Sequence, residues 1–161
     1  MLKKKIRKKI LNLRKNNFCD KQKIKFSVLL KILKKNRIIK GIVGGYFPVN
    51  YEMDDLNILK ELESKKFKIS LPVVKKNNKL DFYRWSSKDS LQLNQYGIPE
   101  PIKSKLVYPD ILLVPLVAFD YRKFRLGYGG GFYDRYIERL KKIKKFISIG
   151  LAFDFQKVTK L

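Results

Sequence analysis

The sequence predicts an α/β fold in which a mostly parallel sheet is flanked by helices. Segments with apolar residues at helical spacing alternate along the chain with short apolar runs, which is the order typical of βα units. The short runs are apolar throughout rather than alternating, as expected for parallel strands that are covered on both faces. Together these observations indicate that most strands run parallel.

The first part of the chain is predicted to form two helices and a strand. Apolar residues at helical spacing predict a helix over residues 2–14. Asp20 is the expected N-cap of a second helix that reaches about Lys35. Residues 38–47 are then expected to form a strand, because they make up an apolar run that Pro48 ends.

The remaining elements are predicted in the same way. Asp54 or Asp55 should cap a helix that carries three leucines. A turn is expected at residues 77–78, a rigid loop with two prolines at 97–101, and a last helix that ends at about Lys141. Further strands are predicted at residues 68–74, 80–85, 111–115 and 146–153.

The composition limits the class of protein. A chain of 161 residues fits one domain, and its 45% of apolar residues can form a core. No apolar run reaches the roughly 18 residues of a membrane-spanning helix, so we expect no membrane partner. Cys19 is the only cysteine and cannot form an intramolecular disulfide, which fits a reducing cytoplasm.

The chain contains no histidine, which excludes several kinds of site. It has no Ser-His-Asp triad, no Cys-His pair and no histidine metal ligand. A bound metal would need carboxylates, water and ligand phosphates, which are the ligands of magnesium. A general acid or base would have to be Asp, Glu, Lys, Tyr or Cys.

The formal net charge is +24 and is unevenly placed. Residues 1–40 carry 16 basic side chains against one acidic, residues 41–120 carry 11 against 10, and residues 121–161 carry 11 against three. A basic nucleic-acid-binding protein is one interpretation. However, 30 of the 38 basic residues are lysine, whereas base readout depends mainly on arginine. We therefore favour a surface that attracts anionic small molecules.

Residues 125–135 contain the most informative motif of the sequence. Four glycines fall within five positions, after an apolar run and before an amphipathic helix. This order of strand, glycine-rich loop and helix directs backbone N–H groups and a helix N-terminus at an anion, usually a phosphate. A tight turn without a ligand is the alternative interpretation.

The glycine-rich block is one of several that follow one another in a characteristic order. The blocks are Lys3 with Arg7, Tyr46-Phe47-Pro48 with Glu52, and residues 71–74, 97–101, 109–110, 114–120 and 125–135. With these blocks the chain resembles the 5-formyltetrahydrofolate cyclo-ligases, also called 5,10-methenyltetrahydrofolate synthetases. The resemblance covers nearly the whole chain. It implies a three-layer α/β/α architecture, the NagB/RpiA/CoA-transferase-like fold.

The resemblance also implies a reaction. ATP phosphorylates the formyl oxygen of 5-formyltetrahydrofolate, N10 attacks, and phosphate leaves to give 5,10-methenyltetrahydrofolate and ADP. ATP is the co-substrate and Mg²⁺ the expected cofactor. Phosphoryl transfer needs positioning and charge neutralisation more than a protein nucleophile, so a chain without histidine is suited to it. We expect a cytoplasmic monomer whose partners are these small molecules, with no specific nucleic-acid partner.

The residue roles implied by the resemblance begin with ATP. The expected ATP contacts are Lys3, Arg7, Arg125, Leu126, Gly127, Tyr128, Gly129, Gly130, Gly131, Phe132 and Tyr133. Arg125 and Tyr133 are the expected catalytic residues, and Asp134 is the expected magnesium ligand. An acid at Asp134 would also complement the helix dipole without any metal. Lys4 or Lys5 would replace Lys3 if the register differs.

The folate-binding residues implied by the resemblance are Phe47, Glu52, Tyr128, Gly129, Gly130, Gly131 and Phe132. A carboxylate at Glu52 can accept two N–H bonds from the amino-pyrimidine edge of a pterin. Tyr83 and Trp85 could stack on a flat ring, but we favour a place for both in the core.

One departure from the family pattern leaves an alternative open. Family members usually continue with a segment that carries another magnesium-binding aspartate and a last strand, and Asp154 does not match it. We expect residues 1–161 to form a single cyclo-ligase-like domain without this segment. A truncated relative that binds folate or nucleotide without turnover is therefore the second hypothesis.

Overall fold

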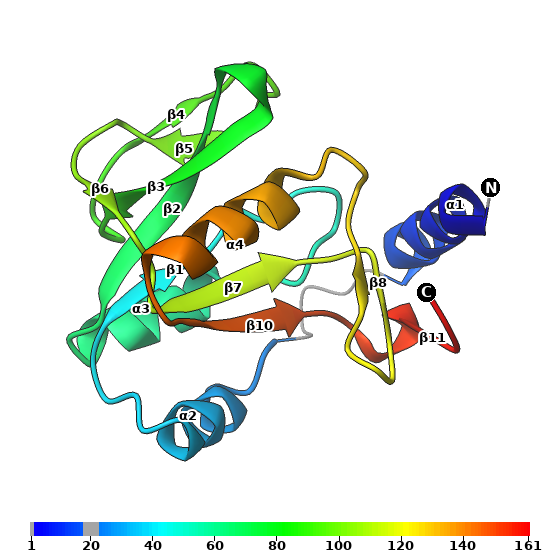
Figure 1. The fold of residues 1–161 in the computed structure, drawn as a ribbon, viewed down its shortest axis with the longest axis horizontal. Coiled ribbons are helices and arrows are strands. Elements are labelled where there is room, and N and C mark those ends of the chain that lie inside the picture. The colour runs from blue at the N-terminus through cyan, green and yellow to red at the C-terminus, as the bar shows by residue number, and fades with distance from the viewer. Residues whose placement is uncertain (1, 18–22) are drawn as a thin grey trace.

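The computed structural model describes residues 2–17 and 23–161, which are arranged around a central sheet (Figure 1). The strands of this sheet are β1 (Ile42–Gly44), β2 (Lys68–Lys75), β3 (Lys79–Trp85), β6 (Leu106–Val107), β7 (Ile111–Pro115) and β10 (Ile147–Leu151). Their order is β10-β7-β1-β2-β3-β6. Neighbours from β10 to β2 are parallel, whereas β3 pairs antiparallel with β2 and β6. The predicted, mostly parallel sheet is confirmed.

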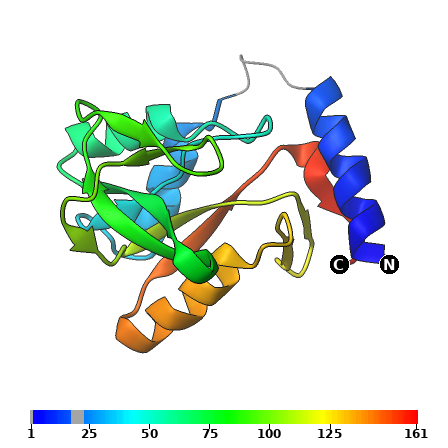
Figure 2. The same cartoon turned by 90° about the horizontal axis from the view of Figure 1, so that it is seen from above.

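Helices cover both faces of the sheet. Figure 2 shows α4 (Phe132–Ile143) on one side, and α2 (Phe26–Lys35) and α3 (Leu56–Ser64) on the other. The central strand β7 serves both layers. Ile111 and Leu113 pack in the cluster that includes α2 and α3, whereas Leu112 and Val114 pack in the cluster that includes α4. Because neither face of β7 meets water, its sequence is apolar at every position.

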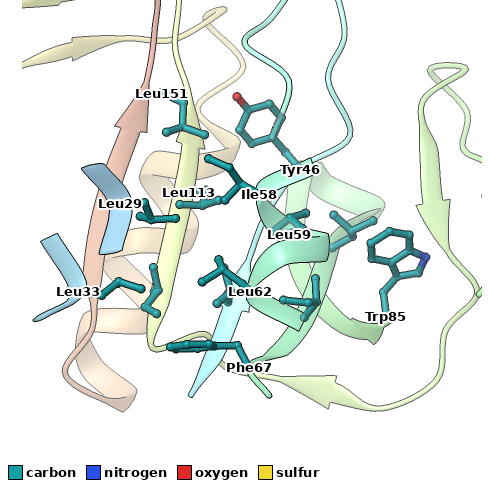
Figure 3. Close-up of a cluster of buried hydrophobic side chains, with 14 residues drawn as sticks. Leu29, Leu33, Tyr46, Ile58, Leu59, Leu62, Phe67, Trp85, Leu113 and Leu151 are labelled. Carbon is teal, nitrogen blue, oxygen red and sulfur yellow. The ribbon is translucent and has the colours of Figure 1, made fainter. Parts of the chain in front are cut away.

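The larger of the two clusters holds α2 and α3 on the sheet (Figure 3). Leu33, Leu59 and Leu62 are at most 1% exposed. Burial of such a side chain contributes about 1.5–3 kcal/mol each. Neither helix has a side-chain hydrogen bond at its N-cap, so packing of the apolar face is what stabilises both helices.

Helix α1 (Leu2–Asn16) packs beside the three layers on a second, small sheet. This sheet has the order β11-β8-β9, with β8 (Ala118–Asp120), β9 (Arg125–Leu126) and β11 (Lys157–Val158). Gln156, in the 3₁₀ turn η2 (Asp154–Gln156), donates to the carbonyls of Leu116 and Val117 at 2.8 and 2.9 Å. Helix α1 and the segment that follows η2 therefore lie close together on this small sheet (Figure 1).

Two predictions for the first part of the chain are wrong in their bounds. The second helix begins at Phe26 with Lys25 as its N-cap, and Asp20 and Cys19 lie outside the described residues. The strand predicted at 38–47 is only three residues long. The Ile38 N–H bonds back to the end of α2, and the Tyr46 N–H turns away from the sheet to Asp55, so neither continues the ladder.

The predicted loop at 97–101 is partly a strand. Pro99–Pro101 forms β5, which pairs with β4 (Leu91–Leu93) in a separate two-stranded sheet. Two prolines are tolerated there because an edge strand needs few N–H donors. At the start of α3 the Asp54 carboxylate accepts the Leu56 N–H at 2.8 Å, whereas the Asp55 side chain makes no capping bond. The turn expected at 77–78 lies in the 3₁₀ segment η1 (Lys76–Asn78).

None of the helices in the described part of the chain combines the length and the apolar character needed to cross a bilayer.

Gly45→Ala should destabilise the fold. A Cβ at this position would lie 2.4 Å from Leu59 Cδ1 and 2.8 Å from Asp55 Oδ2. We expect a loss of about 1–3 kcal/mol in the free energy of unfolding, because both neighbours are fully buried. Gly127→Ala is the matched control, since its Cβ would meet only Arg125 Nη1 at 3.8 Å. Equal effects of the two variants in urea unfolding would contradict the prediction.

Candidate functional site

The candidate site lies at the carboxyl edge of the parallel strands. Loop 45–55 follows β1, and the glycine loop, residues 127–131, leads into α4 at the same end of the sheet (Figure 1). In open α/β sheets, ligands bind in the crevice outside the carboxyl ends of the strands. The fold therefore brings two segments that are distant in sequence to the place where a ligand is expected.

The glycine loop presents the N-terminus of α4. Gly129 and Gly131 have φ angles of 112° and 67°, which side chains other than hydrogen disfavour. Gly131 is the N-cap and no side chain caps the helix. A Cβ on Gly130 would lie 2.7 Å from the Phe132 ring. The first N–H groups of α4 are therefore suited to an anion, as the sequence predicts.

Helix α1 brings Arg7 to this loop. Arg7 Nε donates to the Gly127 carbonyl at 2.8 Å, and a Cβ on Gly129 would lie 3.6 Å from Arg7 Cζ. Lys3 is exposed one helical turn earlier. The spacing of these two basic residues thus places both on the side of α1 that faces the glycine loop, with Arg7 in direct contact.

Glu52 is the buried carboxylate of loop 45–55 and is only 4% exposed. Its Oε2 accepts the Val49 N–H at 2.8 Å, and it hydrogen-bonds to the Tyr128 hydroxyl in the glycine loop. Burial raises the pKa of Glu52, while these two hydrogen bonds and the charge of Arg14 oppose the rise. Phe47 is half-buried in the same loop.

Two further polar groups lie beneath the site. Asp55 is fully buried; its Oδ2 accepts the Tyr46 N–H at 3.1 Å, and Oδ1 has no partner among the described residues. Burial raises the pKa of Asp55 well above its ordinary value, and the charges of Asp54 and Glu52 add to the rise. The buried Tyr133 hydroxyl likewise has no partner in the described structure, and burial raises its pKa.

Arg125 and Asp134 form an ion pair at the start of α4. The Asp134 side chain is 71% exposed, so solvent and a ligand can reach it. Residues 2–17 and 23–161 contain no group of three or more Asp, Glu or Cys side chains that could hold a metal ion. A cation at Asp134 would therefore take most of its oxygens from a ligand and from water, which is usual for magnesium.

The comparisons with known proteins agree with this geometry. The sequence model of the 5-formyltetrahydrofolate cyclo-ligase family matches residues 1–161. The chain belongs to this family. Curated cyclo-ligases from Haemophilus influenzae and Escherichia coli are 38% and 35% identical to it over 126 and 131 residues. The matches cover 74% and 77% of this chain, and 67% and 71% of the two relatives.

Solved structures of cyclo-ligase relatives have the same fold. The 5,10-methenyltetrahydrofolate synthetase of Aquifex aeolicus superimposes with a TM-score of 0.77 at 33% identity, covering all of this chain and 82% of the other. The synthetase of Mycoplasma pneumoniae gives a TM-score of 0.72 at 25% identity, covering all of this chain and 91% of the other.

Three residues of this cyclo-ligase family member were assigned no site role from the sequence. Arg14 lies two turns beyond Arg7 on α1 and is 1% exposed, and Asp55 was expected only as a helix cap. Tyr96 is 53% exposed and meets the Phe132 ring edge to face, with centroids 6.4 Å apart. For Tyr96, its position next to the 97–101 block could have indicated a site role. For Arg14, its helical spacing from Arg7 could have done so.

Other expected residues are buried away from solvent. Tyr83 and Trp85 are 8% and 6% exposed, so the preference for a core position is confirmed. Leu126 is 4% exposed and packs in the cluster that includes Val117 and Ala118. Only its backbone is therefore placed to contact a ligand.

Asp55→Asn should reduce the pH dependence of stability. Because the pKa of Asp55 is raised by burial, the folded state keeps this proton at pH values where the unfolded state has lost it. This contribution is most favourable below the ordinary aspartate pKa of about 3.9, and falls by up to about 1.4 kcal/mol per pH unit until the raised pKa is passed.

Urea unfolding between about pH 4 and about pH 8 measures this effect. Asp54→Asn, at an exposed neighbouring acid, is the control. The stability of wild type relative to Asp55→Asn should fall as the pH rises. A difference between them that stays constant over the range would contradict the prediction.

Proposed function

We propose that the chain is an ATP-dependent ligase that converts 5-formyltetrahydrofolate to 5,10-methenyltetrahydrofolate and releases ADP and phosphate. Membership of the cyclo-ligase family over residues 1–161 supports the reaction. The observation that carries the assignment to this site is a juxtaposition. The glycine loop is suited to a phosphate, and Arg14 links it through Tyr128 to Asn50 in loop 45–55, which carries the buried carboxylate Glu52 suited to a pterin.

ATP is the co-substrate in this family, and the glycine loop is its proposed site. The N–H groups of the glycine loop and of the first turn of α4 would receive the phosphates, with Arg7 and Arg125 neutralising charge. Lys3 would contribute a further positive charge from α1. Asp134 would hold Mg²⁺ together with phosphate oxygens, and the ion would neutralise charge that develops on the transferred phosphoryl group.

Folate is proposed to bind against loop 45–55. The Glu52 carboxylate would accept N–H bonds from the amino-pyrimidine edge, which needs its ionised form. Tyr128 and Phe132 of the glycine-rich segment, Phe47 of loop 45–55, and Tyr96 would surround the flat rings. The pterin would then lie between the carboxylate and the phosphates, so that the formyl oxygen faces ATP.

The chemical step follows from this placement. The formyl oxygen attacks the γ-phosphorus and ADP leaves; N10 then attacks the activated carbon, loses its proton, and phosphate departs with the former formyl oxygen. The protein would orient the two substrates, and Arg125 would stabilise the negative charge on the phosphoryl group during its transfer. The raised pKa of Tyr133 keeps its hydroxyl protonated, which makes it a hydrogen-bond donor rather than a base.

Asp134→Ala should abolish most of the activity. The assay follows the absorbance of methenyl-folate after 5-formyltetrahydrofolate and Mg-ATP are mixed with the protein. Loss of the proposed metal ligand should lower the rate by at least about 100-fold, because one electrostatic contact to the transition state is removed. Glu138→Ala is the matched control, since Glu138 is an exposed acid one turn later on α4 that pairs only with Lys141 among the described residues.

The outcomes of this assay separate the two hypotheses. A rise that requires ATP and Asp134, with Glu138→Ala equal to wild type, supports the ligase. Folded wild-type protein that binds 5-formyltetrahydrofolate or ATP but produces no methenyl-folate would instead support the relative that binds without turnover.

A further inference from the structure

Arg14 is a buried cation with no ion pair among the described residues. It is 1% exposed, and it is the only buried Lys or Arg in the described parts of the chain. Its partners are neutral: Nε donates to the Asn50 carbonyl at 2.9 Å, Nη1 to the Leu116 carbonyl at 3.3 Å, and Nη2 to the Tyr128 hydroxyl. Burial of a charge is costly unless its donors are satisfied, so such a residue calls for an explanation.

The three acceptors belong to three segments that meet at the carboxyl edge of the sheet. Asn50 is in loop 45–55, Leu116 follows β7, and Tyr128 is in the glycine loop. The guanidinium also lies 5.5 Å from the centroid of the Tyr128 ring. One side chain of α1 therefore fixes both loops of the proposed site relative to the sheet.

The contact with Asn50 bears directly on Glu52. Asn50 and Tyr51 have φ angles of 50° and 60°, which are unfavourable for residues other than glycine. The turn is closed in both directions, because the Glu52 N–H bonds to the Val49 carbonyl and the Glu52 side chain accepts the Val49 N–H. The hydrogen bond from the buried Arg14 to the Asn50 carbonyl stabilises this strained turn.

The charge of Arg14 acts on the same carboxylate. It lowers the pKa of Glu52 against the effect of burial. The other titratable groups that influence Glu52, or that it influences, are Tyr46, Asp55, Tyr128 and Tyr133. None of these four is a cation, so Arg14 supplies the positive charge of this cluster, which adds to the hydrogen bonding from Val49 and Tyr128 in favouring the charged form of Glu52.

We propose that Arg14 is a positioning residue of the folate site, which orients Glu52 and Tyr128 through its bonds to the Asn50 carbonyl and the Tyr128 hydroxyl and supplies the positive charge of this buried cluster. This inference rests on the proposed function, because it takes Glu52 to be the carboxylate that binds folate. ATP should depend less on Arg14, since its proposed contacts are backbone N–H groups together with Lys3, Arg7 and Arg125, and none of these three side chains is a partner of Arg14.

The test compares Arg14→Met, Arg14→Lys and Lys15→Met in the full chain. Methionine removes the charge and the donors, lysine keeps the charge but not the planar set of donors, and Lys15 is an exposed neighbour on the same helix. The measurements are the dissociation constants for 5-formyltetrahydrofolate across a pH series and for Mg-ATP, with circular dichroism to confirm folding.

For Arg14→Met we expect folate binding to weaken by about ten-fold or more, the effect of a lost hydrogen bond to a buried group, with a change of less than about three-fold for Mg-ATP. The pH below which folate binding is lost should move upward, because Glu52 would be protonated more easily. Arg14→Lys should weaken folate binding with little change in this pH, and Lys15→Met should match wild type.

A variant that only distorts or destabilises the fold would not shift the pH dependence of folate binding. This pH dependence therefore distinguishes a positioning role of Arg14 from a purely structural one. Folded Arg14→Met with wild-type affinity and pH profile would overturn the inference. If Arg14→Met does not fold, wild-type folate affinity in Arg14→Lys would overturn it. Failure of wild type itself to bind 5-formyltetrahydrofolate would overturn the proposed function and this inference together.

Discussion

The parallel alignment of β1, β7 and β10 is the constraint on which the candidate site depends. Val43 and Ile147 both pair with Ile111, so the three strands run in register and end at one edge of the sheet. Each of the segments that follow them carries part of the site or supports it. The same alignment explains why the core is apolar on both sides of β7, since a parallel strand has no solvent face.

Charge is distributed in opposite ways on the surface and beneath the site. The chain has a net charge of +24, yet two acids, Glu52 and Asp55, are buried there with a single buried cation, Arg14. A net charge of this sign and size attracts anions to the protein surface in general. Burial raises the pKa values of both acids, which favours their neutral forms. In either protonation state a buried carboxyl group can form hydrogen bonds to a ligand.

The sequence predicted the elements whose signal is local and left out those fixed by distant contacts. Strand β7 and helix α4 were found because their apolar patterns match their burial. Strand β5 was missed because its pairing with β4, and not its residue types, makes it a strand. The glycine loop, Arg7 and Glu52 were predicted as site residues from motifs, and the structure places Arg7 in contact with the glycine loop and Glu52 as a buried carboxylate. Arg14 and Tyr96 gained site roles only from contacts across the fold.

The contacts of α1 have a consequence for how the chain acquires its site. Arg7 and its partner Gly127 are 120 residues apart, and Arg14 and Tyr128 are 114 apart. Contacts between residues so far apart in sequence can form only after most of the chain is present. During synthesis the helix must wait on the ribosome until the glycine loop has emerged. Strand β10 of the central sheet and strand β11 beside α1 are also made after the glycine loop, so the sheet can be completed and α1 can dock only when nearly all of residues 1–161 have been synthesised.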